Sequence, residues 1–131
     1  MGPLPATILI VEDEPVIASA MQESLQRAGA QVLVASCIQE AIMLCSRNKP
    51  EIALLNTGKM PDKEGVAFAD MLYRHFGIWP LIVTGTWQQD NPDSNSGAAK
   101  WPVLYKPFTI PQLLRFVAER APHTSDSHPT P

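Results

Sequence analysis

The sequence predicts an α/β fold in which one parallel sheet is covered by helices on both faces. Five short apolar runs are typical of strands buried on both sides, and they span residues 6–11, 31–35, 51–56, 79–84 and 102–105. Segments with the period of a helix alternate with these runs along the chain. Because crossovers between parallel strands are right-handed, this alternation places helices above and below a single sheet.

Four segments have helical periodicity and recognisable ends. The first begins with Pro15, which suits the first turn of a helix, and it ends before Gly29. Thr109 is expected to cap the last. The expected helices and their inward side chains are 15–28 with Val16, Ile17, Ala20, Met21, Ser24 and Leu25, 37–48 with Ile38, Ala41, Ile42 and Cys45, 64–76 with Val66, Ala69, Leu72 and Phe76, and the helix after Thr109 with Ile110, Leu113, Leu114 and Val117.

One inter-strand segment and the two chain ends lack these patterns. Residues 86–100 show no usable periodicity, so the fourth helix is expected to be short or irregular. Residues 1–5 form an N-terminal arm and 6–120 one domain of ordinary size. Residues 121–131 are polar and Pro-rich, which predicts a disordered tail.

Composition excludes some classes of function. The formal net charge is −3 and no basic cluster occurs, which argues against sequence-independent nucleic-acid binding. No targeting signal or membrane span is present, so a cytoplasmic location is expected. Cys37 and Cys45 fall on one predicted helix about 12 Å apart, too far for a disulfide. Buried free thiols are therefore expected.

Polar residues follow four of the five predicted strands. They are Glu12, Asp13, Asn56, Thr84 and Lys106. Each could belong to an ordinary loop, but ligand sites in such folds lie beyond the carboxyl ends of the strands. Acids there would hold a divalent cation, while a hydroxyl and an ammonium would contact phosphoryl oxygens. The set therefore predicts a phosphate pocket, with Asn56 where an aspartate would carry the phosphate.

Four sequence blocks carry a family resemblance. They run from Ile8 to Pro15, from Leu54 to Asn56, from Ile82 to Gly85 and from Leu104 to Phe108. In this order they resemble the receiver domain of two-component response regulators, a CheY-like domain, over residues 6–120. The resemblance implies a flavodoxin-like (βα)5 three-layer sandwich with strand order 2-1-3-4-5. It also makes the bond before the proline of the last block a candidate for the cis form.

The resemblance assigns a role to each residue of the pocket. Glu12 and Asp13 match the paired metal-binding acids, with Asp13 as the preferred direct ligand. Thr84 matches the switch hydroxyl, and Lys106 matches the ammonium that contacts the phosphoryl group. Asn56 occupies the phosphoacceptor position. The family's backbone carbonyl ligand would fall at Gly58, but the altered loop around that residue leaves this assignment open.

Asn56 departs from the family in charge and in chemistry. An acyl phosphate needs a carboxylate nucleophile, and an amide is too weak a nucleophile to replace it. Mg²⁺ prefers anionic oxygens, so its binding should be weakened. We expect the pocket to be more stable without metal than that of an ordinary receiver, with Lys106 neutralising Asp13.

Two further departures concern the switching machinery. Pro61 comes five residues after Asn56, where receivers typically have it at four, and Lys59 adds a positive charge. Val103 stands where receivers often carry an aromatic switch residue, and Tyr105 is expected on the other side of the strand. Asn56 is explained either by natural divergence or by an engineered replacement, and these two changes favour divergence.

The expected function is that of a stand-alone pseudo-receiver, a non-enzymatic regulator that binds a partner protein without being phosphorylated. The partner would be a histidine kinase, a phosphotransfer protein or another signalling protein, contacted through residues 15–28 and 101–120. A homodimer through 101–120 is a further expectation. The alternative is a conventional phospho-accepting receiver whose aspartate was mutated to asparagine. A flavodoxin-like enzyme or electron carrier is disfavoured because residues 12–14 are acidic, opposite to a phosphate-binding loop.

Overall fold

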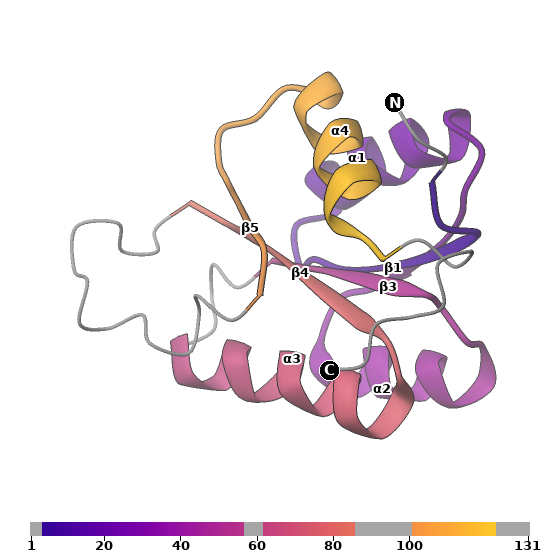
Figure 1. Cartoon of the computed structure of the whole chain (residues 1–131), viewed down its shortest axis with the longest axis vertical. Coiled ribbons are helices and arrows are strands. Elements are labelled where there is room, and N and C mark those ends of the chain that lie inside the picture. Colours follow the sequence, from indigo (N-terminus) through magenta and orange to yellow (C-terminus); the bar gives the residue numbers. More distant parts are fainter. Residues whose placement is uncertain (1–3, 57–61, 86–100, 123–131) are drawn as a thin grey trace.

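A five-stranded parallel sheet forms the centre of the molecule (Figure 1). The computed structural model describes residues 4–56, 62–85 and 101–122. The strands are β1 (Thr7–Val11), β2 (Gln31–Ala35), β3 (Ile52–Asn56), β4 (Trp79–Thr84) and β5 (Val103–Tyr105). Every neighbouring pair is parallel and the order is β2-β1-β3-β4-β5. The predicted strands and their order are thereby confirmed.

Within the described residues, four helices cover the sheet in two layers. They are α1 (Pro15–Arg27), α2 (Ile38–Arg47), α3 (Asp62–Phe76) and α4 (Ile110–Arg120). Figure 1 shows α1 and α4 together on one face, and α2 and α3 on the other. Residues 86–100, where a short or irregular fourth helix is expected, lie outside the described residues. No helix within the described ranges is both long and apolar enough to cross a bilayer.

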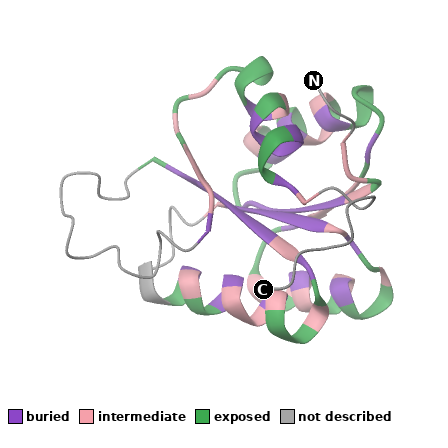
Figure 2. Ribbon diagram, in the orientation of Figure 1, coloured by how far each residue is buried: buried purple, intermediate pink, exposed green. Residues whose placement is uncertain are grey.

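The three central strands β1, β3 and β4 are buried on both faces, and their side chains alternate between two hydrophobic clusters. Leu9 and Leu55 belong to the cluster that packs on α2 and α3. Ile10 and Leu54 belong to the cluster that packs on α1 and α4. Figure 2 shows the same division, with buried strands between helices that are exposed on their outer sides. Central strands of this kind have continuous apolar runs, which is why the sequence predicted them correctly.

The ends of α1 and α4 follow the chemistry that their sequences predicted. Thr109 caps α4: its side chain accepts a hydrogen bond from the Gln112 amide at 3.2 Å, and the Gln112 side chain accepts one from the Thr109 amide at 2.7 Å. Pro15 lies in the first turn of α1. Gly29 follows the helix with a φ of +107°, a conformation that favours glycine.

Two of the predicted inward faces were partly wrong. Val16 is 81% exposed, because it stands about 180° around the helix from the buried Leu25. The buried stripe of α1 consists of Ala18, Met21 and Leu25, and Ala20 is exposed. Ile110 is 41% exposed, because it lies in the first turn of α4 at the edge of the sheet.

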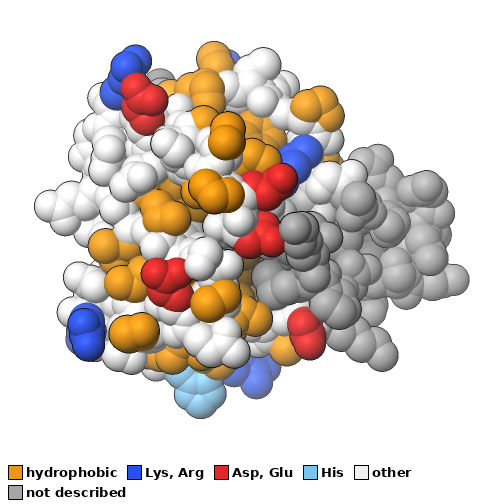
Figure 3. Space-filling view, turned by 180° about the vertical axis from the view of Figure 1, so that it is seen from behind, with side chains coloured by type: hydrophobic (Ala, Val, Ile, Leu, Met, Phe, Trp, Pro, Cys, Tyr) orange, Lys and Arg blue, Asp and Glu red, His pale blue; other side chains and the backbone are white. Residues whose placement is uncertain are grey.

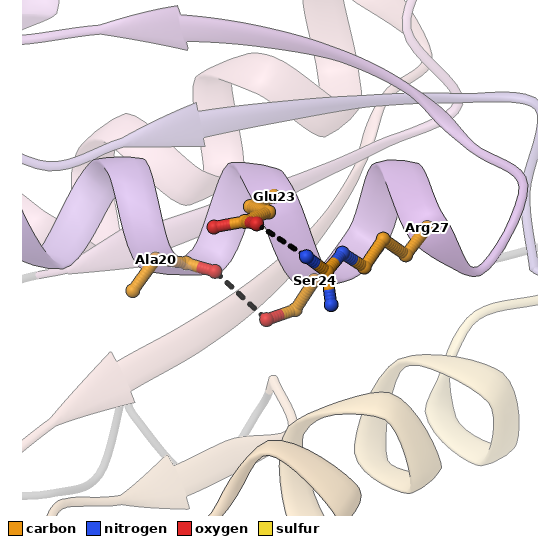
Figure 4. Close-up of polar contacts among 4 residues, drawn as sticks. All are labelled: Ala20, Glu23, Ser24 and Arg27. Carbon is orange, nitrogen blue, oxygen red and sulfur yellow. Dashed lines mark hydrogen bonds and ion pairs between the residues drawn. The ribbon is translucent and has the colours of Figure 1, made fainter.

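The outer face of α1 carries its own polar contacts (Figure 4). Arg27 forms an ion pair with Glu23 at 2.8 Å, between side chains that are 78% and 63% exposed. Such exposed pairs contribute about 0.3–0.5 kcal/mol. Ser24, expected to face inward, is half-buried and its hydroxyl donates to the Ala20 carbonyl at 2.8 Å. Both contacts join residues within α1, so they do not attach the helix to the sheet.

The two cysteines differ in environment. Both thiols are free, as predicted. Cys45 is buried on the inner face of α2, and burial raises the pKa of its thiol. Cys37 is exposed, contrary to the expectation, because it is the N-cap of α2 and lies outside the helix.

An aromatic cluster joins elements at the amino ends of β4 and β5. The rings of Tyr73, Trp79 and Trp101 lie with centroids 5.2 to 5.7 Å apart. Trp101 Nε1 donates to Asp70 Oδ1 at 2.9 Å, and Trp79 Nε1 donates to the carbonyl of Arg120 at 3.1 Å. The cluster therefore ties α3, β4 and the end of α4 together at the end of the sheet opposite the predicted pocket.

Candidate functional site

The sheet brings the predicted polar residues to its carboxyl edge. Asn56 and Thr84 end β3 and β4, while Glu12 and Lys106 directly follow β1 and β5. The register pairs Val11 with Leu55, so that Glu12 is level with Asn56. These positions come from four different strands, and only a parallel sheet brings all four to one edge.

Glu12 is the buried centre of this site, with 3% of its surface exposed. Its Oε1 atom accepts a hydrogen bond from Nδ2 of Asn56 and lies 4.0 Å from Nζ of Lys106. Its Oε2 atom accepts a hydrogen bond from the amide of Glu14 at 3.1 Å. One carboxylate thus links the ends of β1 and β3, the segment after β5 and the start of α1.

Asp13 has a different environment from its neighbour. It is exposed, whereas Glu12 is buried. The sequence pointed to Asp13 as the residue that Lys106 neutralises, and the structure adds an ion pair between Lys106 and Glu12 that was not predicted. The central role of Glu12 was therefore missed, because adjacent acids cannot be ranked by burial from sequence alone.

Thr84 and Lys106 are held by the β4–β5 pairing. Thr84 is fully buried, and its carbonyl accepts a hydrogen bond from the Lys106 amide at 2.9 Å. The Lys106 stem passes close to Gly85, where an added Cβ would lie 3.5 Å from Lys106 Cβ. The Lys106–Pro107 peptide is cis, as the resemblance suggested.

One prediction about β5 was wrong. Tyr105 was expected on the other side of the strand from Val103, but side chains alternate along a strand and residues two apart share a face. Val103 packs on the α2 and α3 side while Leu104 packs on the opposite side, which places Tyr105 on the Val103 face. Tyr105 is paired in register with Thr84 and is 40% exposed.

Some predicted features lie outside the described residues. They are Gly58, Lys59 and Pro61 in the loop after β3, and most of the expected tail.

The resemblance implies a bound Mg²⁺ ion, and the described residues do not fit one in the arrangement observed. Mg²⁺ requires an octahedral set of oxygens, usually with one or two carboxylates directed at it. Within the described ranges, no group of three or more Asp, Glu, His or Cys side chains could hold a metal. Both carboxylate oxygens of Glu12 already accept hydrogen bonds, Oε1 from the Asn56 Nδ2 atom and Oε2 from the Glu14 amide.

Known proteins resemble this chain in sequence. Over 113 residues it is 31% identical to the transcriptional regulatory protein PdtaR of Mycobacterium tuberculosis, covering 85% of this chain and 54% of PdtaR. It is 29% identical over 76 residues to the alkaline phosphatase synthesis transcriptional regulatory protein PhoP of Bacillus subtilis, covering 58% of this chain and 31% of PhoP. The chain spans about half the length of the first of these relatives and less of the second.

Solved structures share the fold. A CheY-like receiver domain protein from Methanospirillum hungatei superposes with a TM-score of 0.70 at 25% identity, covering 85% of this chain and 89% of that one. A response regulator from Thermotoga maritima superposes with a TM-score of 0.74 at 19% identity, covering 86% and 93%. The family profile described as the response regulator receiver domain matches residues 8–118. The chain therefore belongs to the response regulator receiver domain family of two-component signalling.

Proposed function

We propose that this chain is a pseudo-receiver, a non-enzymatic regulatory protein that binds a signalling partner in the cytoplasm without accepting phosphate. The observation that carries the proposal is the state of Asn56, which donates its Nδ2 hydrogen bond to the buried Glu12. Phosphoryl transfer would need a carboxylate nucleophile at this position. An amide that is engaged as a donor supplies neither the charge nor the nucleophilic oxygen.

The remaining residues of the pocket support a fixed conformation. Lys106, which would contact a phosphoryl group in a working receiver, lies 4.0 Å from Glu12. Thr84 is fully buried at the end of β4. A site whose cation is already engaged by a carboxylate has a weaker electrostatic pull on an incoming phosphoryl group. These features favour constitutive binding over switching.

The partner surface is proposed to include α1 and residues 101–120. Val16 and Ile110 are among the most exposed large apolar side chains of the described residues, and they lie in the first turns of α1 and α4. These helices neighbour each other on one face of the sheet (Figure 1). Exposed acids at Asp13 and Glu14 stand at the same edge. This combination suits a histidine kinase or phosphotransfer protein that presents an apolar helix face with basic neighbours.

Charge distribution argues for a protein partner. On the face drawn in Figure 3, the Lys and Arg side chains are scattered and do not gather into one basic patch. The formal net charge of −3 also argues against a nucleic-acid partner. Nucleic-acid binding by phosphate neutralisation needs a concentrated basic surface.

The proposal is tested by capturing partners on the immobilised chain with and without a small-molecule phosphoryl donor and Mg²⁺. The chain with Asn56, which is the natural sequence under this proposal, should retain the same partner with the same affinity under both conditions. Val16→Asp, which introduces a charge on the exposed face of α1, should weaken that capture. Partner binding that appears only with the phosphoryl donor would contradict the proposal.

A conventional receiver with a replaced acceptor is the second candidate, favoured by three pocket residues that are still present. Glu12, Thr84 and Lys106 stand together and the Lys106–Pro107 bond is cis. Restoring the acceptor with Asn56→Asp separates the two candidates. Efficient phosphorylation of that variant with Mg²⁺ supports the second candidate, and its failure supports a diverged pseudo-receiver.

A further inference from the structure

The buried carboxylate of Glu12 needs compensation for its loss of water. An ionised carboxylate placed in a protein interior is costly unless it is paired and hydrogen-bonded. Here three groups supply that compensation: the Asn56 amide, the Lys106 ammonium and the backbone amide of Glu14. Each comes from a different part of the chain, and Asn56 and Lys106 converge on the same oxygen atom.

Lys106 offsets the buried charge of Glu12, while the neighbouring acid Asp13 is exposed. Glu12 contributes one negative charge and Lys106 one positive charge, while Asn56 contributes a neutral donor. A second carboxylate in place of Asn56 would put two negative groups within hydrogen-bond distance of each other. Like charges that close disfavour ionisation of both groups, unless a cation lies between them.

We propose that the Asn56 amide takes the place of a divalent cation in this site, so that Glu12 and the ends of β1, β3 and β5 are held together without metal. The inference rests on the proposed function, because a site that receives no phosphoryl group has no need of a cation to receive it. The contact that supports the inference is the hydrogen bond from Asn56 Nδ2 to Oε1 of Glu12, an oxygen that a divalent cation would otherwise bind.

The test is thermal unfolding of the full chain in EDTA and in millimolar Mg²⁺. The natural protein should have the same melting temperature in both. Asn56→Asp should melt roughly 5–10 °C lower in EDTA, because it sets a carboxylate against the buried Glu12, and Mg²⁺ should restore most of that loss. Asn48→Asp is the matched control: it makes the same chemical change at the far end of α2 and should show no recovery with Mg²⁺.

Two further variants cover the case in which Asn56→Asp fails to fold. Asn56→Ala removes the amide without adding charge, and it should lower the melting temperature by about 5 °C. The double variant Glu12→Gln with Asn56→Asp moves the negative charge from position 12 to position 56, so that one side chain of the pair is still a donor and the other an acceptor. It should melt closer to the natural protein than Asn56→Asp does, in EDTA as well as in Mg²⁺.

The inference would be overturned if Mg²⁺ stabilised the natural protein as much as it stabilises Asn56→Asp. It would also be overturned if Asn56→Ala melted at the natural temperature, since the amide would then hold nothing. Failure of the proposed function would be seen in a different measurement, as phosphorylation of the chain or as phosphate-dependent partner binding. The melting measurements and the binding measurements therefore fail independently.

Discussion

Removing the charge of Lys106 while keeping its stem should destabilise the protein through Glu12. The substitution is Lys106→Met, which retains the apolar chain that lies close to Gly85. At the observed separation of 4.0 Å, an effective dielectric constant of about 20 gives a gross attraction of about 4 kcal/mol. The Lys106 side chain is 26% exposed and desolvation opposes the pairing, so we expect a net coupling of about 1–2 kcal/mol.

The assay is urea unfolding of a double-mutant cycle. Four proteins are compared: the natural chain, Lys106→Met, Glu12→Gln and the double variant. The Lys106→Met change should cost about 1–2 kcal/mol in the natural background and much less when Glu12 is already neutral. Asn56 remains able to bond to either side chain at position 12, so the cycle isolates the charge pair. A coupling free energy below about 0.3 kcal/mol would refute the ion pair as a contributor to stability.

Three other predictions concern the described parts of the fold. Trp101→Phe should lower stability by about 1–3 kcal/mol, measured by chemical unfolding, because the indole donor to Asp70 is lost; an unchanged midpoint would contradict this. Thr109→Ala should cost about 1 kcal/mol by the same method, and a cost no larger than that of an exposed control substitution would count against the cap. Burial raises the pKa of the Cys45 thiol, so the folded protein keeps a proton that the unfolded chain releases. The free energy of unfolding of the natural chain should therefore fall above about pH 8.5 relative to that of Cys45→Ala, and parallel pH profiles would contradict this. Iodoacetamide should alkylate Cys37 faster than Cys45, and equal alkylation rates would contradict the burial of Cys45.

The strands were predictable because burial on both faces leaves a direct record in the sequence. Central strands such as β1 and β3 contain continuous apolar runs, and the chain turns polar where each strand ends. The positions of Glu12 and Asn56 at one edge then follow from the parallel arrangement alone. The same logic placed Thr84 and Lys106, whose strands β4 and β5 pair in register.

The contacts within the site were not predictable from that record. Glu12 and Asp13 are adjacent and chemically alike, and only the path of the chain beyond β1 decides which of them is buried. The amide of Asn56 could in principle turn either its oxygen or its nitrogen toward the acids. The structure shows that the nitrogen faces Glu12, which changes the interpretation from a missing charge to a supplied donor.

Long-range packing was missed for a related reason. Trp101 is distant in the sequence from Tyr73 and Trp79, and the three residues have no shared periodicity, so their cluster becomes visible only in three dimensions. Val16 was assigned to the wrong face because apolar residues in a first helical turn resemble core residues in a short window. Its 81% exposure marks it as available for contact with another molecule.

The central claim is that the chain does not accept phosphate, and the most direct test is incubation with a small-molecule phosphoryl donor and Mg²⁺ followed by intact-mass measurement. The natural chain should show no adduct under conditions in which an ordinary receiver is labelled. A stoichiometric, hydrolytically labile phosphoryl adduct on the natural chain, absent from Asn56→Ala, would contradict the account.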